Sequence, residues 1–130
     1  MATGILIVTQ PGIGQALVGA AEGVLGRLPL QCGTFEVPHG TDPDTLLPAA
    51  SAAMRRVDGG DGVLVLIDMH GSAAARVASK LAHLGTPVRR VAGASLPMLL
   101  RVLDYADKPL DELPAIAAAG ARNGVILEDG

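Results

Sequence analysis

Aromatic side chains and cysteines are scarce in this sequence. Its 130 residues include no Trp, one Tyr, one Phe and one Cys. Proteins that bind single-stranded nucleic acids hold the bases largely by stacking them on aromatic rings, so the composition argues against that class. The lone Cys32 excludes an intramolecular disulfide and a zinc site built from several cysteines, and it fits a reducing compartment.

Charge and long apolar runs are also limited. Charged residues make up 18% of the chain and the formal net charge is −3, which gives no basic surface for nucleic acid or for an anionic membrane. Apolar runs such as residues 62–67 are much shorter than the about 20 residues that cross a bilayer, and the N-terminus has no basic signal-peptide segment. We therefore expect a cytoplasmic protein without direct membrane insertion.

What the sequence does have is aliphatic residues, enough for one core. The hydrophobic fraction is 49%, which predicts one domain over residues 1–130. Short apolar runs alternate with helical patterns, and unbroken apolar runs are typical of parallel strands buried on both faces. The fold class is therefore α/β: a doubly wound, mainly parallel sheet in the strand order 2-1-3-4, to which the apolar tail at 125–127 is expected to add an edge strand.

The expected elements follow from apolar periodicity and from Gly, Pro and capping residues. Strands are expected at residues 4–9, 30–37, 63–67 and 88–94. Helices are expected at residues 13–28, 43–57, 72–84, 98–105 and 110–121, and Thr41 or Asp42 is expected to cap the second.

Three loops carry most of the polar and special residues. They are residues 9–12 (Thr-Gln-Pro-Gly), 68–72 (Asp-Met-His-Gly-Ser) and 95–97 (Ser-Leu-Pro), and each follows a predicted strand. In a doubly wound sheet such loops meet at one edge, so we expect Gln10, Asp68 and Ser95 to come together. A glycine turn before a helix suits a phosphoryl-sized anion, although glycines there also simply permit a tight turn. The phosphoryl-binding candidates are Thr9, Gly12, Gly14, Gly71, Ser72 and Ser95.

A dinucleotide site is a weaker interpretation of the first loop. Residues 12–17 (Gly-Ile-Gly-Gln-Ala-Leu) approach the dinucleotide fingerprint, and Glu36 follows at the place of a ribose-binding acid. Leu17, however, occupies the position where close packing needs Gly or Ala, and the chain is too short for a second mononucleotide half. We expect no nicotinamide cofactor.

Asp68 and His70 lie close enough in sequence to form a charged pair or to share a metal. His39 and His83 fall in other parts of the chain, so no cluster with metal-ligand spacing is present and we expect no metal. Asp68 is equally typical of a helix cap. The Arg-Arg pairs at 55–56 and 89–90 indicate solvated faces, and either pair could instead present charge to an acidic partner.

Taken together, the three loops resemble the mannose-type IIA component of the bacterial phosphoenolpyruvate:sugar phosphotransferase system, over essentially the whole chain. In that family the first strand ends in a Thr-His-Gly-like turn. The third ends in Asp followed by a Gly-Gly/Ala-Ser-Pro stretch, and the fourth leads into Asn-x-Pro-Met-Leu. The counterparts here are residues 9–12, 68–74 and 95–99, and residues 20–26 match the family's first helix.

The resemblance implies a phosphoryl relay. The family's histidine takes phosphate from a histidine-containing phosphocarrier protein and passes it to a IIB component or a regulatory target, while the Asp matching Asp68 orients the imidazole. The resemblance also implies a homodimer paired through the C-terminal segment. Gln10 stands at the acceptor position, and its amide nitrogen is not nucleophilic because its lone pair is delocalised into the carbonyl. Phosphoryl transfer at residue 10 is therefore predicted to be absent.

Three explanations of Gln10 stay open. An engineered change would leave the neighbouring loops family-like, yet Ala73 and Ala74 replace the family's Ser-Pro and Ser95 replaces its Asn. Natural divergence into a regulatory module that binds proteins without chemistry accounts for all of these changes. The third explanation moves the acceptor to His70, which demands a new geometry with the partner.

Overall fold

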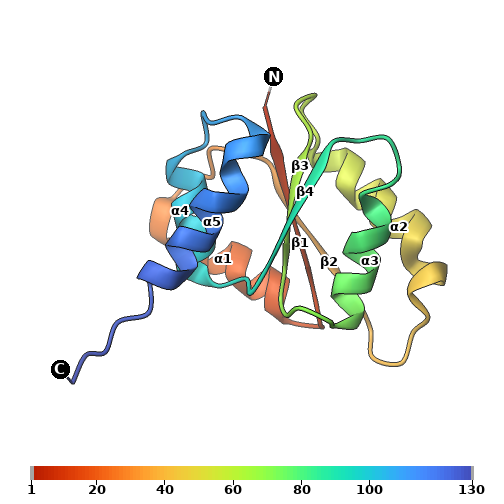
Figure 1. Cartoon of the computed structure of the whole chain (residues 1–130), viewed down its shortest axis with the longest axis horizontal. Coiled ribbons are helices and arrows are strands. Elements are labelled where there is room, and N and C mark those ends of the chain that lie inside the picture. Colours follow the sequence, from red (N-terminus) through yellow and green to blue (C-terminus); the bar gives the residue numbers. More distant parts are fainter. Residues whose placement is uncertain (1, 130) are drawn as a thin grey trace.

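Strands and helices alternate along the chain in the computed structural model, which describes residues 2–129 (Figure 1). The strands are β1 (Gly4–Thr9), β2 (Cys32–Glu36), β3 (Val63–Ile67) and β4 (Val88–Ala92). The helices are α1 (Ile13–Leu25), α2 (Pro43–Val57), α3 (Ala73–Leu81), α4 (Leu96–Asp104) and α5 (Leu113–Asn123), with a 3-10 turn at Leu110–Glu112 before α5.

The four strands form one sheet in the order β2-β1-β3-β4, and all three pairings are parallel. This confirms the predicted fold class and strand order. Ile7 lies between Thr34 of β2 and Leu66 of β3, so β1 and β3 form the centre of the sheet. The strand order reverses between β1 and β3, and in such sheets a crevice opens at that point beyond the carboxyl ends of the strands.

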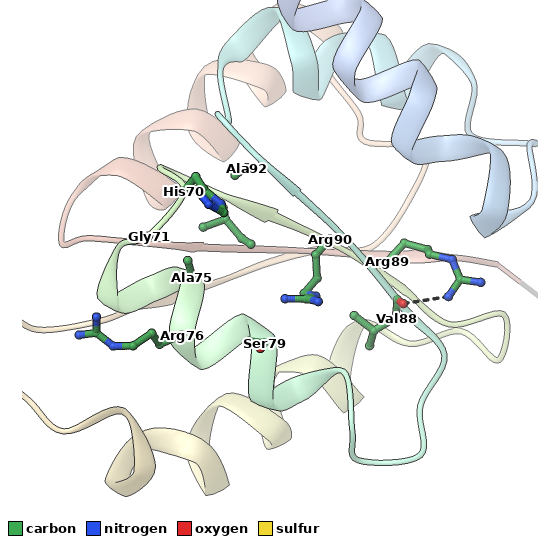
Figure 2. A pocket seen from close by; sticks show the side chains of 10 residues that line it. His70, Gly71, Ala75, Arg76, Ser79, Val88, Arg89, Arg90 and Ala92 are labelled. Atoms are coloured by element: carbon green, nitrogen blue, oxygen red, sulfur yellow. Dashed lines mark hydrogen bonds between the residues drawn. The ribbon is translucent and has the colours of Figure 1, made fainter.

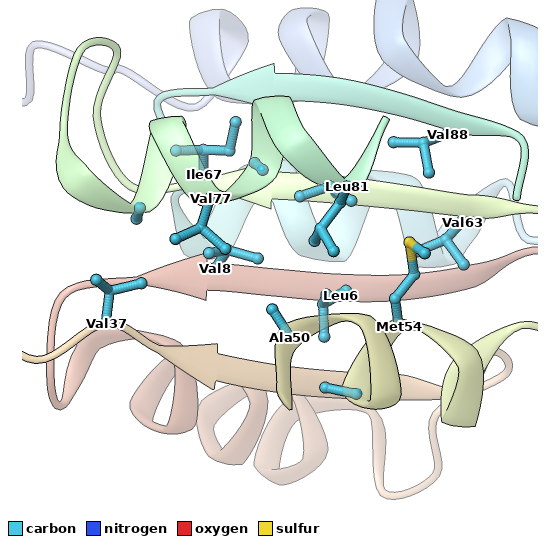
Figure 3. Close-up of a cluster of buried hydrophobic side chains, with 14 of the residues drawn as sticks. Leu6, Val8, Val37, Ala50, Met54, Val63, Ile67, Val77, Leu81 and Val88 are labelled. Atoms are coloured by element: carbon cyan, nitrogen blue, oxygen red, sulfur yellow. The ribbon is translucent and has the colours of Figure 1, made fainter. Parts of the chain in front are cut away.

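Helices cover both faces of the sheet, with α2 and α3 on one side and α1, α4 and α5 on the other (Figure 1). Successive side chains of a strand point to opposite faces. Leu6 and Val8 of β1 therefore pack under α2 and α3 (Figure 3), while Ile5 and Ile7 pack under the other helices. All four are completely buried, which explains why the central strands are continuous apolar runs.

Most differences from the sequence-based boundaries occur at element ends. β1 and β3 have the predicted bounds, and Asp42 caps α2 by accepting the backbone N–H of Asp44. The first helix ends at Leu25 rather than at residue 28, because Gly26 adopts a positive φ of 74° and stops it. The second strand is shorter at both ends than predicted. Among residues 2–129, no helix has both the length and the apolar character needed to cross a membrane.

The C-terminal tail adds no strand to the sheet of this chain. Val125, Ile126 and Leu127 are 76%, 69% and 86% exposed, and in Figure 1 the segment runs away from the body of the molecule. The final helix continues to Asn123, two residues beyond its predicted end. The apolar tail thus has no partner within the part of the chain that the structure describes.

Candidate functional site

The loops that follow β1 and β3 lie against each other, as predicted. Val8 pairs with Ile67 at the ends of these two parallel strands, so both chains leave the sheet side by side. The backbone N–H of Gln10 donates a hydrogen bond of 2.8 Å to Oδ2 of Asp68. Residues 58 positions apart in the sequence are therefore joined at the carboxyl edge of the sheet.

The carboxylate of Asp68 holds this edge together. Besides the bond from Gln10, its Oδ1 accepts the backbone N–H of Met69 at 2.7 Å and the hydroxyl of Ser72 at 3.0 Å. Ser72 in turn caps α3, since its Oγ accepts the N–H of Ala75 at 3.1 Å. Asp68 thus fixes both loops, and the cap of α3 belongs to Ser72 rather than to Asp68.

Thr9 fixes the turn into α1. Its side chain is completely buried, and its hydroxyl donates to the carbonyl oxygen of Gln10 at 2.7 Å and accepts the N–H of Gly14 at 3.0 Å. Gly12 begins the helix with a φ of 89°, a conformation that favours glycine, and no side chain caps the helix from that position. The sequence therefore needs Gly12 for the shape of the turn.

The N–H groups at the start of α1 are largely engaged within the chain. Ile13 donates to the carbonyl of Gln10 at 3.4 Å, Gly14 donates to Thr9, and Gln15 donates to Oε2 of Glu36 at 3.4 Å. Glu36, at the end of β2, places a carboxylate where the helix dipole favours an anion. A phosphoryl group at this turn would therefore rely on Gly12 and displace or adjust one of these contacts.

Ser95 lies at the same edge, one strand further out. The N–H of Ala94 still pairs with the carbonyl of Ile67 at 2.9 Å, and Ser95 then caps α4 by accepting the N–H of Met98 at 3.3 Å. Its hydroxyl is used for that cap, and it makes no bond to Gln10 or Asp68 among the described residues. Ser95 lies at the predicted edge of the sheet. The side chain that contacts Gln10 directly, however, is that of Asp68.

His70 lies on the exposed part of the same loop. The carboxylate of Asp68 accepts hydrogen bonds from Gln10, Met69 and Ser72. Within residues 2–129, His70 makes no hydrogen bond to that carboxylate. His70 instead lines a groove beside β4, and Gly71 turns the chain there with a φ of 82°. No group of three or more His, Cys, Asp or Glu residues in the described chain has an arrangement that would hold a metal.

Cys32 lies away from this edge, at the start of β2. Burial raises the pKa of its thiol to about 11, and the charge of Glu22 contributes to the same direction. A thiol with so high a pKa is almost entirely protonated near neutral pH and is a poor nucleophile. Cys32 is a packing residue of the sheet.

Two contacts were not anticipated from the sequence. The sequence suggests Glu36 only as a ribose ligand, whereas its carboxylate accepts the backbone N–H of Gln15 at the start of α1. The sequence suggests a solvated face for Arg90, whereas Arg90 lines a groove together with His70. The sequence of β4 could have indicated this position for Arg90. Residues 88, 90 and 92 lie on one face of the strand, and only residue 90 is charged.

A doubly wound parallel sheet of four strands, with Asp68 joining the turns after β1 and β3, defines a small IIA-type domain. The chain belongs to the family described as the fructose IIA component of the phosphotransferase system (PTS), whose model matches residues 4–117. It is 30% identical over 127 residues to the mannose-specific EIIAB component of the PTS from Escherichia coli. That alignment covers 96% of this chain and 39% of the relative, so the chain spans about two fifths of its length.

Solved structures agree on the fold. The mannose/sorbose specific IIA subunit from Enterococcus faecalis superposes with a TM-score of 0.85 at 20% identity, over 100% of this chain and 97% of that one. A phosphotransferase system EIIA component from Streptococcus agalactiae gives a TM-score of 0.84 at 17% identity, over 98% of both chains. The family match and the 30% identical relative, together with this shared fold, confirm the predicted resemblance to mannose-type IIA components.

Proposed function

We propose that this chain is a IIA-type protein of the phosphotransferase system that does not carry a phosphoryl group at residue 10 and acts by binding proteins. The observation that carries the proposal is Gln10 itself, at the position where the family resemblance puts the phosphoacceptor histidine. A carboxamide nitrogen cannot form the phosphoramidate that a relay requires. The expected partners are the family's own, a histidine-containing phosphocarrier protein and a IIB component or regulatory target.

The geometry around residue 10 supports the proposal that this edge of the sheet can still bind the partner proteins. Asp68 binds the backbone of Gln10 rather than its side chain, so the shape of the turn does not depend on which side chain residue 10 carries. Oδ1 of Asp68 takes two donors whereas Oδ2 takes one, and Oδ2 therefore keeps acceptor capacity for an imidazole N–H. A histidine at position 10 would find its orienting carboxylate in place.

The test is a phosphorylation assay with phosphoenolpyruvate, enzyme I and the phosphocarrier protein from the same organism. The unmodified chain should take up no acid-labile phosphate, and Gln10→His should gain it. Gln10→Asn serves as the matched control, because it changes the residue without adding a nucleophile. Labelling of the unmodified chain would contradict the proposal. If Gln10→His fails to label but still binds the phosphocarrier, the altered loops at 73–74 and 95 no longer support the chemistry.

A relay through His70 is the second candidate. It is favoured by one observation: His70 is exposed on the loop that carries Asp68, at the same edge as Gln10. Against it, no hydrogen bond from Asp68 orients the imidazole in the described chain. Labelling of the unmodified chain that disappears in His70→Ala and persists in His83→Ala would establish this relay.

The exposed tail supports a homodimer. Three consecutive apolar residues, Val125–Leu127, lie open to solvent, and an apolar tail of this kind gains from pairing with a sheet edge of a second copy. Light scattering at about tens of micromolar is expected to give the dimer mass. Ile126→Asp should shift the mass toward the monomer, whereas Glu128→Gln should not; a monomer for the unmodified chain would refute the dimer.

The remaining proposals concern binding and location. We propose that the turn after β1 still accepts a phosphoryl-sized anion through Gly12, with Thr9, Gly14, Gly71, Ser72 and Ser95 as the other candidates. We also propose that the protein works in the cytoplasm. Broadening of the Gly12 amide signal in the NMR spectrum with added phosphate would support the anion site. An unchanged Gly12 signal would refute it.

A further inference from the structure

A groove between α3 and β4 has a character unlike the rest of this acidic chain. It has a volume of about 560 Å³, and its lining includes His70, Arg76, Arg89 and Arg90 with no Asp or Glu. The formal net charge of the whole chain is −3. The groove is therefore a local concentration of positive charge on a protein with an excess of acidic groups.

The cations of the groove differ in how they are used. Arg89 points to the other side of β4, where it forms an ion pair with Asp111 and donates to the carbonyl of Val88. Neither Arg76 nor Arg90 takes part in an ion pair among residues 2–129. Figure 2 shows Arg90 reaching from β4 toward α3, His70 near the Ala92 end of the strand, and Arg76 extending outward from α3.

The floor of the groove is apolar and its helix side is made of small residues. Val88 and Ala92 flank Arg90 on the same face of β4, and Ile67 continues this surface from β3. Opposite them, α3 presents Ala75 and Ser79, one helical turn apart, so side chains there leave space open. A groove with cationic side chains at its rim and an apolar floor suits a small ligand that has an anionic group attached to a partly apolar group.

We propose that this groove is a binding site for a small phosphate monoester, with Arg90 as its main anchor and His70 at its mouth. A guanidinium presents paired N–H donors that match a phosphate bidentately, and an imidazole N–H adds a further donor. The volume lies within the range of small-molecule sites, about 300 to 1,000 Å³. The groove shares His70 and Gly71 with the loop after β3, but its anchor Arg90 lies on β4. The proposal therefore does not depend on whether residue 10 carries a phosphoryl group.

A simpler role for Arg90 is to cover the apolar floor with its aliphatic stem while its head stays in water. That role predicts no preference for phosphate. The two roles can be distinguished by measurement. If the groove binds a phosphate monoester, a change of Arg90 lowers the affinity for that ligand, whereas a change of an arginine elsewhere does not.

The experiment is calorimetric or NMR titration of the full-length chain with phenyl phosphate, inorganic phosphate and phenol. Saturable binding is expected for phenyl phosphate, weaker binding for inorganic phosphate, and none for phenol. Arg90→Gln should weaken phenyl phosphate binding by about tenfold or more, since a charge-assisted hydrogen bond contributes on that order. Arg56→Gln, which removes the same charge from the exposed face of α2, should leave the affinity unchanged.

A second variant tests the shape of the groove rather than its charge. Ser79→Leu fills the space over the floor and should weaken phenyl phosphate more than inorganic phosphate. The proposal is overturned if phenyl phosphate does not saturate, or if Arg90→Gln and Arg56→Gln have equal effects. It is also overturned if a hexaglutamate peptide binds more tightly than phenyl phosphate with the same dependence on Arg90, which would identify the groove as a docking site for an acidic protein segment.

Discussion

The side chain of Gln10 and the loops around it differ in the number of hydrogen bonds that hold them in place. Thr9 and Asp68 together make five hydrogen bonds that fix the turns after β1 and β3. Gln10 is held through its backbone, and its side-chain amide makes no hydrogen bond within the described chain. The hydrogen bonds that hold this edge together are therefore independent of the side chain at residue 10. If residue 10 is the acceptor position, as we propose, a glutamine there would remove the chemistry and leave the fold intact.

Substitutions that disturb the backbone packing beneath these loops should have large effects, beginning with β1, the strand that leads to residue 10. A Cβ added at Gly4 would lie 2.0 Å from the carbonyl oxygen of Val57, where β1 passes the end of α2. We expect Gly4→Ala to lower the free energy of unfolding by about 3 kcal/mol, measured by urea denaturation. The matched control is Gly19→Ala, on the open surface of α1, which should raise it by about 0.5 to 1 kcal/mol. Equal effects of the two changes would mean that α2 is not held tightly against β1.

Asp68→Ala should have the next largest effect, because three donors from two loops lose their common acceptor. A loss of about 2 to 4 kcal/mol is expected from hydrogen bonds to a partly buried carboxylate. Asp61→Ala, which removes an exposed carboxylate without hydrogen bonds in the described chain, should change the free energy of unfolding by less than about 0.5 kcal/mol. A loss below 1 kcal/mol for Asp68→Ala would show that the two loops hold together without it.

Thr9→Val isolates the buried hydroxyl of the turn. The substitution keeps the shape of the side chain but leaves the N–H of Gly14 without its acceptor in a buried site, which is expected to cost about 1 to 3 kcal/mol. Thr45→Val is the control, since its hydroxyl bonds the carbonyl of Asp42 on the exposed start of α2, where water can replace it. The difference between the two, measured under the same conditions, reports the contribution of burial.

The fold was more accessible from the sequence than the contacts of the site. The unbroken apolar runs of β1 and β3 fixed their bounds, because strands buried on both faces leave little choice of residue. The start of α2 was equally clear from the following proline and the two candidate caps, Thr41 and Asp42, of which Asp42 is the cap. The end of α1 was not clear from the sequence. Gly26 is one of several glycines in or next to this apolar helix, and only its positive φ distinguishes it.

The position of Asp68 at the carboxyl edge followed from strand order, and so did its proximity to Gln10. Which atoms meet did not follow, because spacing along the chain says nothing about whether a carboxylate binds a side chain or a backbone N–H. The same holds for Glu36, whose contact with Gln15 joins the end of β2 to the first turn of α1. Arg90 belongs to a groove only because α3 presents small residues opposite it, a relation between elements rather than within one.

The smallest effect is expected at residue 10 itself, and it is the sharpest test of the comparison. Gln10→Ala removes the side-chain amide and keeps both the backbone N–H that binds Asp68 and the carbonyl that accepts from Thr9. The free energy of unfolding should therefore change by no more than about 0.5 kcal/mol, the usual range for a surface side chain without structural contacts. Urea denaturation beside Asp68→Ala gives the contrast directly. A loss above about 1.5 kcal/mol would mean that the Gln10 side chain helps to hold the two loops, and the distinction between that side chain and the loops would then fail.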